Sequence, residues 1–280
     1  MLEHDIPMRM TYVNGHGIRY LDFNNRAPDS GSQSDESRVL VLLHGLGASA
    51  ERWLDVCPEL SKHFRLIIPD IIGFGYSDKP AVEYTLDFFI DFFEGFLKNL
   101  NIHKPYIVGS SFGGHLGAEF AIRFNSRVER LALAAPAGVM RSSTQVLDQY
   151  IMAALYPTFE NAKRAFTNMA YDPNTVTENT VRDFVNRMRL PNAKYAFMST
   201  LLGIRDSPKL SGRLSKIQAR TLLIWGNNDK MIPLQYSKEF GEIPTHELVV
   251  INECGHTPYV EKPEEFNRSV LKFLNSVIRI

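Results

Sequence analysis

The stretch from 105 to 118 constrains the fold of this chain more than any other. A short apolar run, Tyr106–Val108, leads into Gly-Ser-Ser-Phe-Gly-Gly, and a helical pattern follows at once. A strand that turns into a helix within one or two residues forces the residue at the tip into a strained backbone conformation. Strand and helix also come so close that side chains at Gly109 and Gly113 would clash. We therefore expect Ser111 to stand at the tip of a sharp turn between a strand and a helix.

Strands and helices alternate on both sides of this turn. Continuous apolar runs such as Val39–Leu43 are typical of central parallel strands that are covered on both faces. The polar segment Asn24–Ser37 is expected to form a surface loop. The alternation with short connections predicts a parallel α/β sheet with right-handed crossovers. Expected in the first half are a hairpin at Met10–Val13 and Ile18–Phe23, further strands at Phe64–Ile68 and Val128–Ala134, and helices from Trp53 to Leu60, from Thr85 to Phe96 and from Phe112 to about Phe124.

The alternation breaks in the middle of the chain. From 137 to 212 the sequence shows amphipathic helical segments and no good strand: roughly Thr144–Leu155, Phe159–Met169, Glu178–Met188 and Lys194–Leu202. It resumes with a strand at Thr221–Trp225, a helix after Pro233, a strand at Glu247–Ile251 and a last helix from Pro263 to Val277. A helical insertion between the two halves of one sheet predicts a lid. The expected domains are a core at 1–136 and 213–280 and a helical lid at 137–212.

Three side chains are candidates for a catalytic triad at one edge of this sheet. A serine hydroxyl is a poor nucleophile until a base takes its proton, and the base needs a third group to hold its tautomer. Besides Ser111, the candidates are His256 as the base and Asp229 as the third group, and each directly follows a predicted strand. Because the carboxyl ends of parallel strands share one edge, we expect the three to meet there. A surface-loop histidine and an ordinary Asn-Asn-Asp turn are the alternative interpretations.

The same edge offers donors for a developing oxyanion. The Phe112 N–H opens the helix that follows Ser111, where the helix dipole favours negative charge. A sharp turn, His44–Gly47, leaves a neighbouring strand, and we expect the Leu46 N–H to be the second donor. His44 is expected to support this loop by hydrogen bonding.

Composition and charge argue against several classes of partner. Lysine plus arginine and aspartate plus glutamate balance at 31 each, so no net basic charge points to nucleic acid or to an anionic membrane. No run reaches the length of a membrane span, and the first residues lack a signal-peptide pattern, so we expect a cytoplasmic protein. Cys57 and Cys254 are too few for a disulfide framework or a zinc site, and we expect no metal and no cofactor.

Taken together, these motifs closely resemble the α/β-hydrolase superfamily. The resemblance implies a mostly parallel eight-stranded sheet flanked by helices, with the lid inserted after strand 6 and a triad in the order Ser, Asp, His. Within the superfamily the chain looks like the compact lidded branch of carboxylesterases, haloalkane dehalogenases, epoxide hydrolases and meta-cleavage-product C–C hydrolases. The motifs cover nearly the whole chain in register: His44-Gly45-x-Gly47, Asp70-x-x-Gly73-x-Gly75-x-Ser77, Gly109-x-Ser111-x-Gly113-Gly114, Gly226-x-x-Asp229 and Gly255-His256.

Single residues distinguish between these branches. Dehalogenases and epoxide hydrolases of this fold use an aspartate nucleophile, so Ser111 disfavours both. The C–C hydrolases typically carry Asn before the nucleophile and Trp after the base histidine, where this chain has Ser110 and Thr257. They also place a lid arginine on the carboxylate of the substrate. Arg182 and Arg187 are the candidates here, although solvated helix charges are the favoured interpretation of both.

The expected function is therefore that of a serine hydrolase that cleaves carboxylic esters of small to medium size through an acyl-enzyme. The alternative is a C–C bond hydrolase of the meta-cleavage-product type, which shares the triad. An alternative of another class is a ligand-binding receptor on the hydrolase fold with slow turnover. The expected partner is a small-molecule ester or related carbonyl compound, and homo-oligomer formation is left open.

Overall fold

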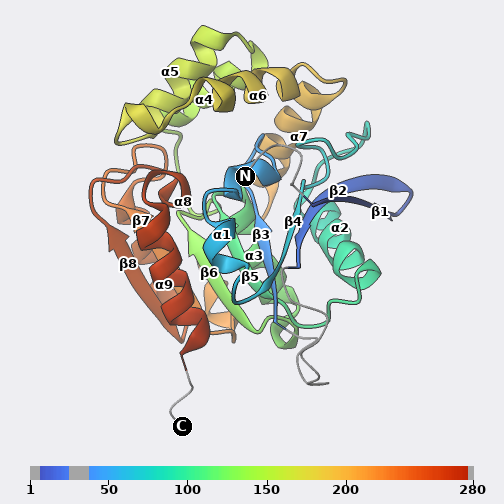
Figure 1. Cartoon of the computed structure of the whole chain (residues 1–280), viewed down its shortest axis with the longest axis vertical. Helices are drawn as coiled ribbons and strands as arrows, with labels where there is room; N and C mark the ends of the chain where they lie inside the picture. Colours follow the sequence, from blue (N-terminus) through green and yellow to red (C-terminus); the bar gives the residue numbers. More distant parts are fainter. Residues whose placement is uncertain (1–6, 25–37, 277–280) are drawn as a thin grey trace.

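Eight strands form one sheet in the computed structural model, which describes residues 7–24 and 38–276 (Figure 1). The strand order is β1-β2-β4-β3-β5-β6-β7-β8. The β1–β2 and β2–β4 pairs are antiparallel and the other neighbouring pairs are parallel, which confirms the predicted mostly parallel sheet. The first residues of the chain and positions 25–37 of the expected loop lie outside the described part. The strands are β1 (Met8–Val13), β2 (His16–Phe23), β3 (Val39–Leu43), β4 (Arg65–Pro69), β5 (Tyr106–Ser110), β6 (Arg130–Ala134), β7 (Thr221–Gly226) and β8 (His246–Ile251).

Helices connect most of these strands. The α-helices are α1 (Cys57–Leu60), α2 (Leu86–Asn99), α3 (Phe112–Arg123), α4 (Gln145–Leu155), α5 (Phe159–Met169), α6 (Glu178–Met188), α7 (Ala193–Asp206), α8 (Pro258–Glu261) and α9 (Pro263–Asn275). Short 3₁₀ helices are η2 (Ala50–Trp53), η3 (Asn125–Arg127), η4 (Pro173–Thr175), η5 (Leu214–Lys216) and η6 (Leu234–Glu242). Within 7–24 and 38–276, no helix combines the length and the apolar character needed to span a bilayer.

Two segments differ from the expected α-helices. The helix expected from Trp53 to Leu60 is split into η2 and α1. Pro58 explains the break, because it has no N–H with which to continue a helical ladder and instead lies in the first turn of α1. The segment after Pro233 is the 3₁₀ helix η6 rather than an α-helix.

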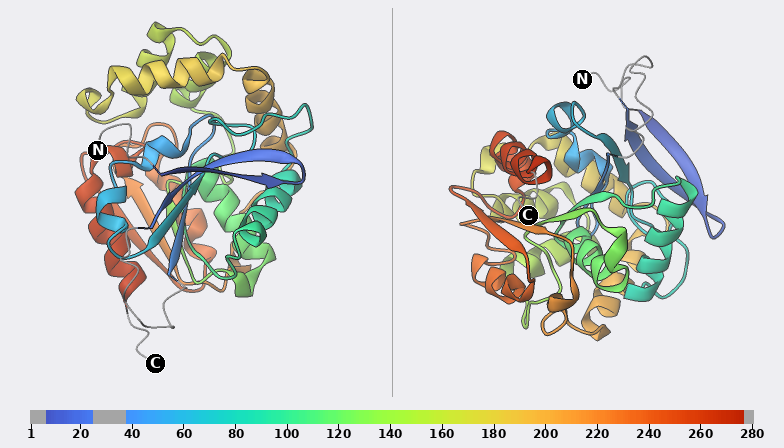
Figure 2. Two further views of the ribbon diagram at one scale, coloured as in Figure 1. Left: turned by 45° about the vertical axis from the view of Figure 1, so that its right-hand side comes forward. Right: turned by 90° about the horizontal axis from the view of Figure 1, so that it is seen from below.

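Both faces of the central strands are buried, which explains their continuous apolar runs. In β3, Val41 and Leu43 belong to a core cluster with side chains of α2 and α3. Leu40 and Leu42 point to the opposite face and pack in a second cluster with Trp53 and side chains of α9. Figure 2 shows the helices on both sides of the sheet.

Four consecutive helices, α4 to α7, lie between β6 and β7 in the sequence, and α4, α5 and α6 stand apart from the sheet in Figure 1. Thr144, Thr158 and Thr177 begin three of these helices, because each side chain accepts a hydrogen bond from an N–H in the first turn. Helix α5 packs against both α4 and α6. The division into core and lid at residues 137 and 212 stays a prediction.

One histidine of α3 is buried without a hydrogen-bond partner. His115 is 1% exposed, and neither ring nitrogen has a partner among the described residues. Burial lowers its pKa from 6.5 to about 4. The unfolded chain takes up a proton near pH 6.5, whereas the folded chain does so only near pH 4. The stability that depends on this group is therefore complete above pH 6.5 and is lost as the pH falls towards 4.

We predict that His115→Gln flattens the acid side of the stability profile. The free energy of unfolding is measured by urea denaturation between pH 7 and pH 4. Its decrease over this range should be smaller in the variant than in the wild type, by about 3 kcal/mol at most. His63→Gln changes an exposed histidine and should keep the wild-type slope. A wild-type slope in His115→Gln would show that another group causes the acid sensitivity.

Candidate active site

The turn between β5 and α3 has the strained geometry expected from its sequence. Ser111 has φ 52° and ψ −115°, a conformation that residues with a side chain rarely adopt. A Cβ on Gly109 would lie 2.3 Å from the carbonyl oxygen of Gly113, and a Cβ on Gly113 would lie 2.2 Å from that of Leu43. The backbone of α3 thus packs directly on β5 and β3, and only glycine fits at these two positions.

Asp229 and His256 form a buried hydrogen-bonded pair in the loops that follow β7 and β8. His256 Nδ1 lies 2.8 Å from Asp229 Oδ2. The other carboxylate oxygen accepts hydrogen bonds from the N–H groups of Met231 and Ile232, at 2.8 and 2.9 Å. Nδ1 therefore donates to the carboxylate, which leaves Nε2 as the accepting ring nitrogen. Nε2 is buried and has no hydrogen-bond partner in the described part of the chain, so it is available to take a proton.

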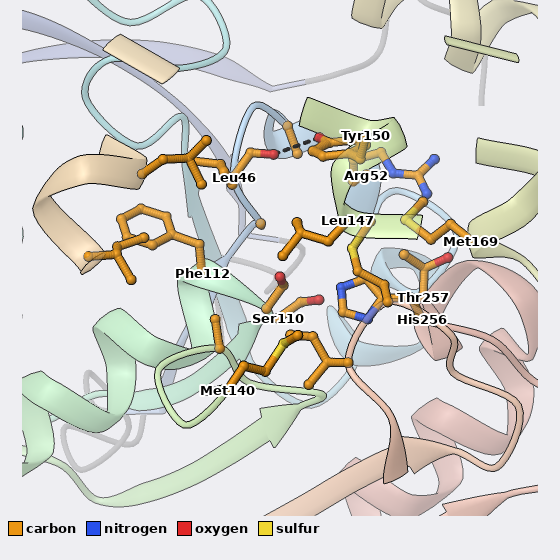
Figure 3. A pocket seen from close by; sticks show the side chains of 18 of the residues that line it. Leu46, Arg52, Ser110, Phe112, Met140, Leu147, Tyr150, Met169, His256 and Thr257 are labelled. Atoms are coloured by element: carbon orange, nitrogen blue, oxygen red, sulfur yellow. Dashed lines mark hydrogen bonds between the residues drawn. The ribbon is translucent and has the colours of Figure 1, made fainter. Parts of the chain in front are cut away.

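His256 and Ser111 line the same cavity (Figure 3). Gly45 faces the serine, and a Cβ on this glycine would lie 3.9 Å from Ser111 Oγ. The structure thus brings the three expected side chains, Ser111, Asp229 and His256, to one edge of the sheet. Their catalytic roles stay a prediction.

The two amides expected to hold an oxyanion also lie at this cavity. Leu46 and Phe112 both line it, and neither N–H donates in the turn, loop and cap hydrogen bonds of the described residues. His44 supports the Leu46 loop. Its Nε2 accepts a hydrogen bond from the Ile71 N–H at 3.0 Å, and its Nδ1 lies 2.8 Å from the Gly45 carbonyl oxygen. Burial lowers the pKa of His44, which keeps the ring neutral in this role.

A buried carboxylate ties the loops around the cavity together. Asp70 is fully buried and accepts hydrogen bonds from Arg19 Nη1 at 2.9 Å, the Ala50 N–H at 2.7 Å and the Tyr76 N–H at 2.8 Å. These bonds join β2, the loop after β3 and the loop after β4. The Asp70 motif noted in the sequence therefore has a structural role: it fixes the loop that carries Leu46.

The cavity has a volume of about 170 Å³ and is lined mostly by apolar side chains. Figure 3 shows Tyr150 and Arg52 on one side of His256 and Met140 on the other. Among the described side chains that line the cavity, three are cationic (Arg52, Arg187 and Lys209) and none is acidic. Nor do the described residues contain a group of three or more His, Cys, Asp or Glu side chains that could hold a metal ion. The cavity therefore suits a mainly apolar ligand that carries negative charge.

Arg187 is not the solvated helix charge that the sequence favoured. Arg187 is 5% exposed and lines the cavity, and its Nε has no hydrogen-bond partner among the described residues. Arg187 faces inward because it lies one turn after Phe184, on the buried face of α6. The interpretation is therefore wrong for Arg187. It is confirmed for Arg182, whose side chain is 64% exposed and pairs with Glu178 at 3.4 Å.

Sequence reasoning did not single out two further cavity residues. Arg52 lies in η2, with Cζ 5.8 Å from the centroid of the Phe166 ring. Tyr150 of α4 donates a hydrogen bond from its hydroxyl to the Leu46 carbonyl oxygen at 2.6 Å. An arginine in a short helix and a tyrosine in an amphipathic helix carry no signal in the sequence. Their roles become visible only when α4 and α5 are placed over the edge of the sheet.

The chain is similar to known proteins over most of its length. The family described as alpha/beta hydrolase fold matches residues 38–263. The 2-hydroxy-6-oxo-2,4-heptadienoate hydrolase of Pseudomonas putida is 33% identical over 245 residues, which cover 84% of this chain and 88% of that protein. The 2-hydroxymuconate semialdehyde hydrolase of a Pseudomonas strain is 34% identical over 245 residues, covering 84% and 86%. A solved structure of a mutant meta-cleavage product hydrolase from Pseudomonas fluorescens has a TM-score of 0.84 and 30% identity, covering 95% of this chain and 97% of that one.

These comparisons overturn the expectation of a carboxylesterase. The relatives are named for a hydroxy-oxo-dienoate, a related semialdehyde and a meta-cleavage product, and none of the three is named for an ester. They favour the alternative of a C–C bond hydrolase. The expectation failed because it gave weight to Ser110 and Thr257, whereas the triad is common to both branches. The buried position of Arg187 was not visible in the sequence.

We predict that a fluorophosphonate probe labels Ser111 selectively, because such probes react with a serine whose proton passes to a neighbouring base. Intact-mass spectrometry should show one adduct on the wild-type protein and none on Ser111→Ala. Asp229→Asn should slow labelling about 10³-fold, since the imidazole loses the carboxylate that holds its tautomer. Ser110→Ala removes the adjacent serine and should label like the wild type. Equal labelling of Ser111→Ala and the wild type would contradict the assignment.

Proposed function

This chain belongs to the α/β-hydrolase family and is a hydrolase, and we propose that it cleaves a carbon–carbon bond in a 2-hydroxy-6-oxo-dienoate. The two curated relatives and the solved structure described above support this class of substrate through their names. Such a molecule has a carboxylate at carbon 1 and a ketone at carbon 6, and the bond that breaks joins carbons 5 and 6. The cavity has cationic side chains for the carboxylate end of this molecule and the Ser111–His256 pair for its ketone end.

The observation that carries this proposal is the buried guanidinium of Arg187. A cation in apolar surroundings is costly unless an anion accompanies it, and arginine does not escape that cost by losing its proton. No acidic side chain lines the cavity among the described residues. A substrate carboxylate supplies the missing charge, whereas a simple neutral ester does not. Arg187 therefore favours a substrate with an anionic end.

A dienoate also makes cleavage of a carbon–carbon bond chemically feasible. Breaking the bond between carbons 5 and 6 leaves its electron pair on carbon 5, where an isolated hydrocarbon chain does not stabilise it. In the 2,6-dioxo tautomer, which forms when the 2-hydroxyl loses its proton and carbon 5 gains one, the pair is delocalised through the double bond onto the oxygen of carbon 2, next to the carboxylate. A cation at that end of the substrate stabilises the charge as it develops. Arg187 therefore binds the substrate and stabilises its leaving group.

Ser111 and His256 act at carbon 6. His256 Nε2 takes the hydroxyl proton while Ser111 Oγ attacks the ketone, and the amides of Leu46 and Phe112 hold the oxyanion. When the oxyanion collapses, the bond between carbons 5 and 6 breaks and His256 returns the proton to the departing dienolate. His256 then activates a water molecule that releases the acyl group from Ser111 as a carboxylic acid. One water is consumed, and the products are a 2-hydroxydienoate and an acid.

The rest of the cavity suits a neutral acyl group. Its lining is largely aliphatic or thioether, and apolar side chains with few polar groups are typical of small-molecule sites. Figure 3 shows Met140 across His256 from Tyr150 and Arg52, and we assign the acyl group to the Met140 side. The aliphatic and thioether lining residues include Ala137, Met140, Leu147, Leu201, Ile204, Met231 and Ile232.

We predict that Arg187→Met lowers kcat/KM for 2-hydroxy-6-oxo-2,4-heptadienoate about 100-fold. Hydrogen bonds to a charged group contribute about 1.5–3 kcal/mol each, and an arginine fork makes two. The decay of the dienoate absorbance measures the rate. Arg182→Met removes an exposed arginine from the same helix and should keep the wild-type kinetics.

Two outcomes count against the proposed function. A wild-type protein that hydrolyses carboxylic esters and leaves the dienoate intact would overturn it. If the wild type cleaves the dienoate and Arg187→Met does so equally well, the assignment of Arg187 to the substrate carboxylate is wrong.

A further inference from the structure

We propose that Arg52 and Arg187 bind the same carboxylate from two sides, which makes Arg52 a specificity-determining residue of this site. The inference rests on the proposed function for the identity of the substrate. The anion site itself rests on the geometry of the cavity, and a binding experiment tests it without any cleavage reaction.

The two arginines reach the cavity from different parts of the fold. Arg52 lies in η2, a few residues after the loop that carries Leu46, and Arg187 lies in the last turn of α6. Both line the cavity. Figure 3 shows Arg52 beside Tyr150 and Met169, with its guanidinium at that side of the cavity.

An aromatic cluster lies between the segments that carry the two arginines. The Phe166 ring lies 5.8 Å from Arg52 Cζ and 5.3 Å from the Phe184 ring, and Phe184 is one helical turn before Arg187. The Tyr150 ring lies 6.0 and 5.4 Å from the same two phenylalanine rings. Arg52 therefore packs against a cluster of rings that includes Phe184, which lies one helical turn before Arg187.

The electrostatics of Tyr150 agree with this placement. Burial raises the pKa of its phenol, and the charges of Arg187 and Arg52 both act to lower that pKa. A charge has this effect only when it lies within electrostatic reach of the phenol. Both guanidiniums therefore act on the same part of the cavity.

Neither arginine has a counter-charge from the described residues. Glu51, the acid next to Arg52, forms its ion pair with Arg19 instead. Arg52 and Arg187 take part in no hydrogen bond from the side chain and no ion pair within 7–24 and 38–276. Two cations at one side of an apolar cavity repel each other. A carboxylate between them removes the repulsion and accepts hydrogen bonds from both planar forks.

A second, smaller cavity adjoins the main one beside Arg52. Thr257 follows His256 and lines the main cavity, and it lines a small adjoining cavity together with Arg52, Phe166 and Met169. The two cavities therefore share Thr257 and Arg52 as lining residues.

Sorbate, hexa-2,4-dienoate, is the probe, because it has one carboxylate and no ketone to cleave. Its neutral amide is the matched control ligand. Calorimetric titration of the whole chain should show that sorbate binds at least about 10-fold more tightly than the amide. Arg52→Met and Arg187→Met should each weaken sorbate binding about 10-fold or more and change amide binding less than about 2-fold. Arg52→Lys keeps the charge and should retain part of the preference.

Sorbate has a single charge, so both substitutions weaken its binding only if both arginines hold that charge. A wild-type protein without preference for sorbate would overturn the inference. The inference would also be overturned if Arg52→Met bound sorbate as tightly as the wild type, whatever the affinity of Arg187→Met. Arg182→Met controls for loss of net charge, and melting temperatures check the fold of each variant. A protein that needs both arginines for sorbate but leaves a 2-hydroxy-6-oxo-dienoate intact would overturn the proposed function alone.

Discussion

Direct contact between backbones at the start of α3 is the constraint on which the rest of the site depends. Gly113 lies against the Leu43 carbonyl and Gly109 against the Gly113 carbonyl, so α3 approaches β3 and β5 more closely than side chains would allow. Ser111 is strained as a result, and hydrogen bonds hold it there: its N–H donates to Ala134 at 3.0 Å, and its carbonyl accepts from Ala137 at 2.9 Å. Strain of this kind persists only where the surrounding structure fixes it. The same contact sets the Phe112 amide beside the serine hydroxyl.

A second level of organisation is electrostatic. Three acids near the cavity hold other parts of the fold: Asp70 joins β2, η2 and the loop after β4, Asp229 holds His256, and Glu51 pairs with Arg19. The arginines of the cavity have no such partners among the described residues. The negative side chains thus hold other groups of the fold in place, and the charged side chains that face the ligand are positive. This division supports an anionic substrate in a cavity that is otherwise apolar.

The sequence predicted those features that depend on local rules. Continuous apolar runs mark strands buried on both faces, and the glycines around Ser111 mark a turn that excludes side chains. The positions of Asp229 and His256 after strands placed them at one edge. What depends on packing between distant segments was not predictable. Whether Arg187 faces solvent or the cavity is decided by how α6 lies on α4 and α5, and the contact of Arg52 with Phe166 appears only once α5 lies against η2. The expected substrate class was wrong for this reason, because it was judged from Ser110 and Thr257 without the charge of the cavity.

The central claim is that Ser111 drives hydrolysis between carbons 5 and 6 of a dienoate whose carboxylate faces the arginines. The most direct measurement is mass spectrometry of the products formed from 2-hydroxy-6-oxo-2,4-heptadienoate in water labelled with oxygen-18. The account predicts 2-hydroxypenta-2,4-dienoate and a carboxylic acid that carries the label from the wild-type protein, and neither product from Ser111→Ala. An intact dienoate after long incubation with the wild type, or equal product from both proteins, would contradict it.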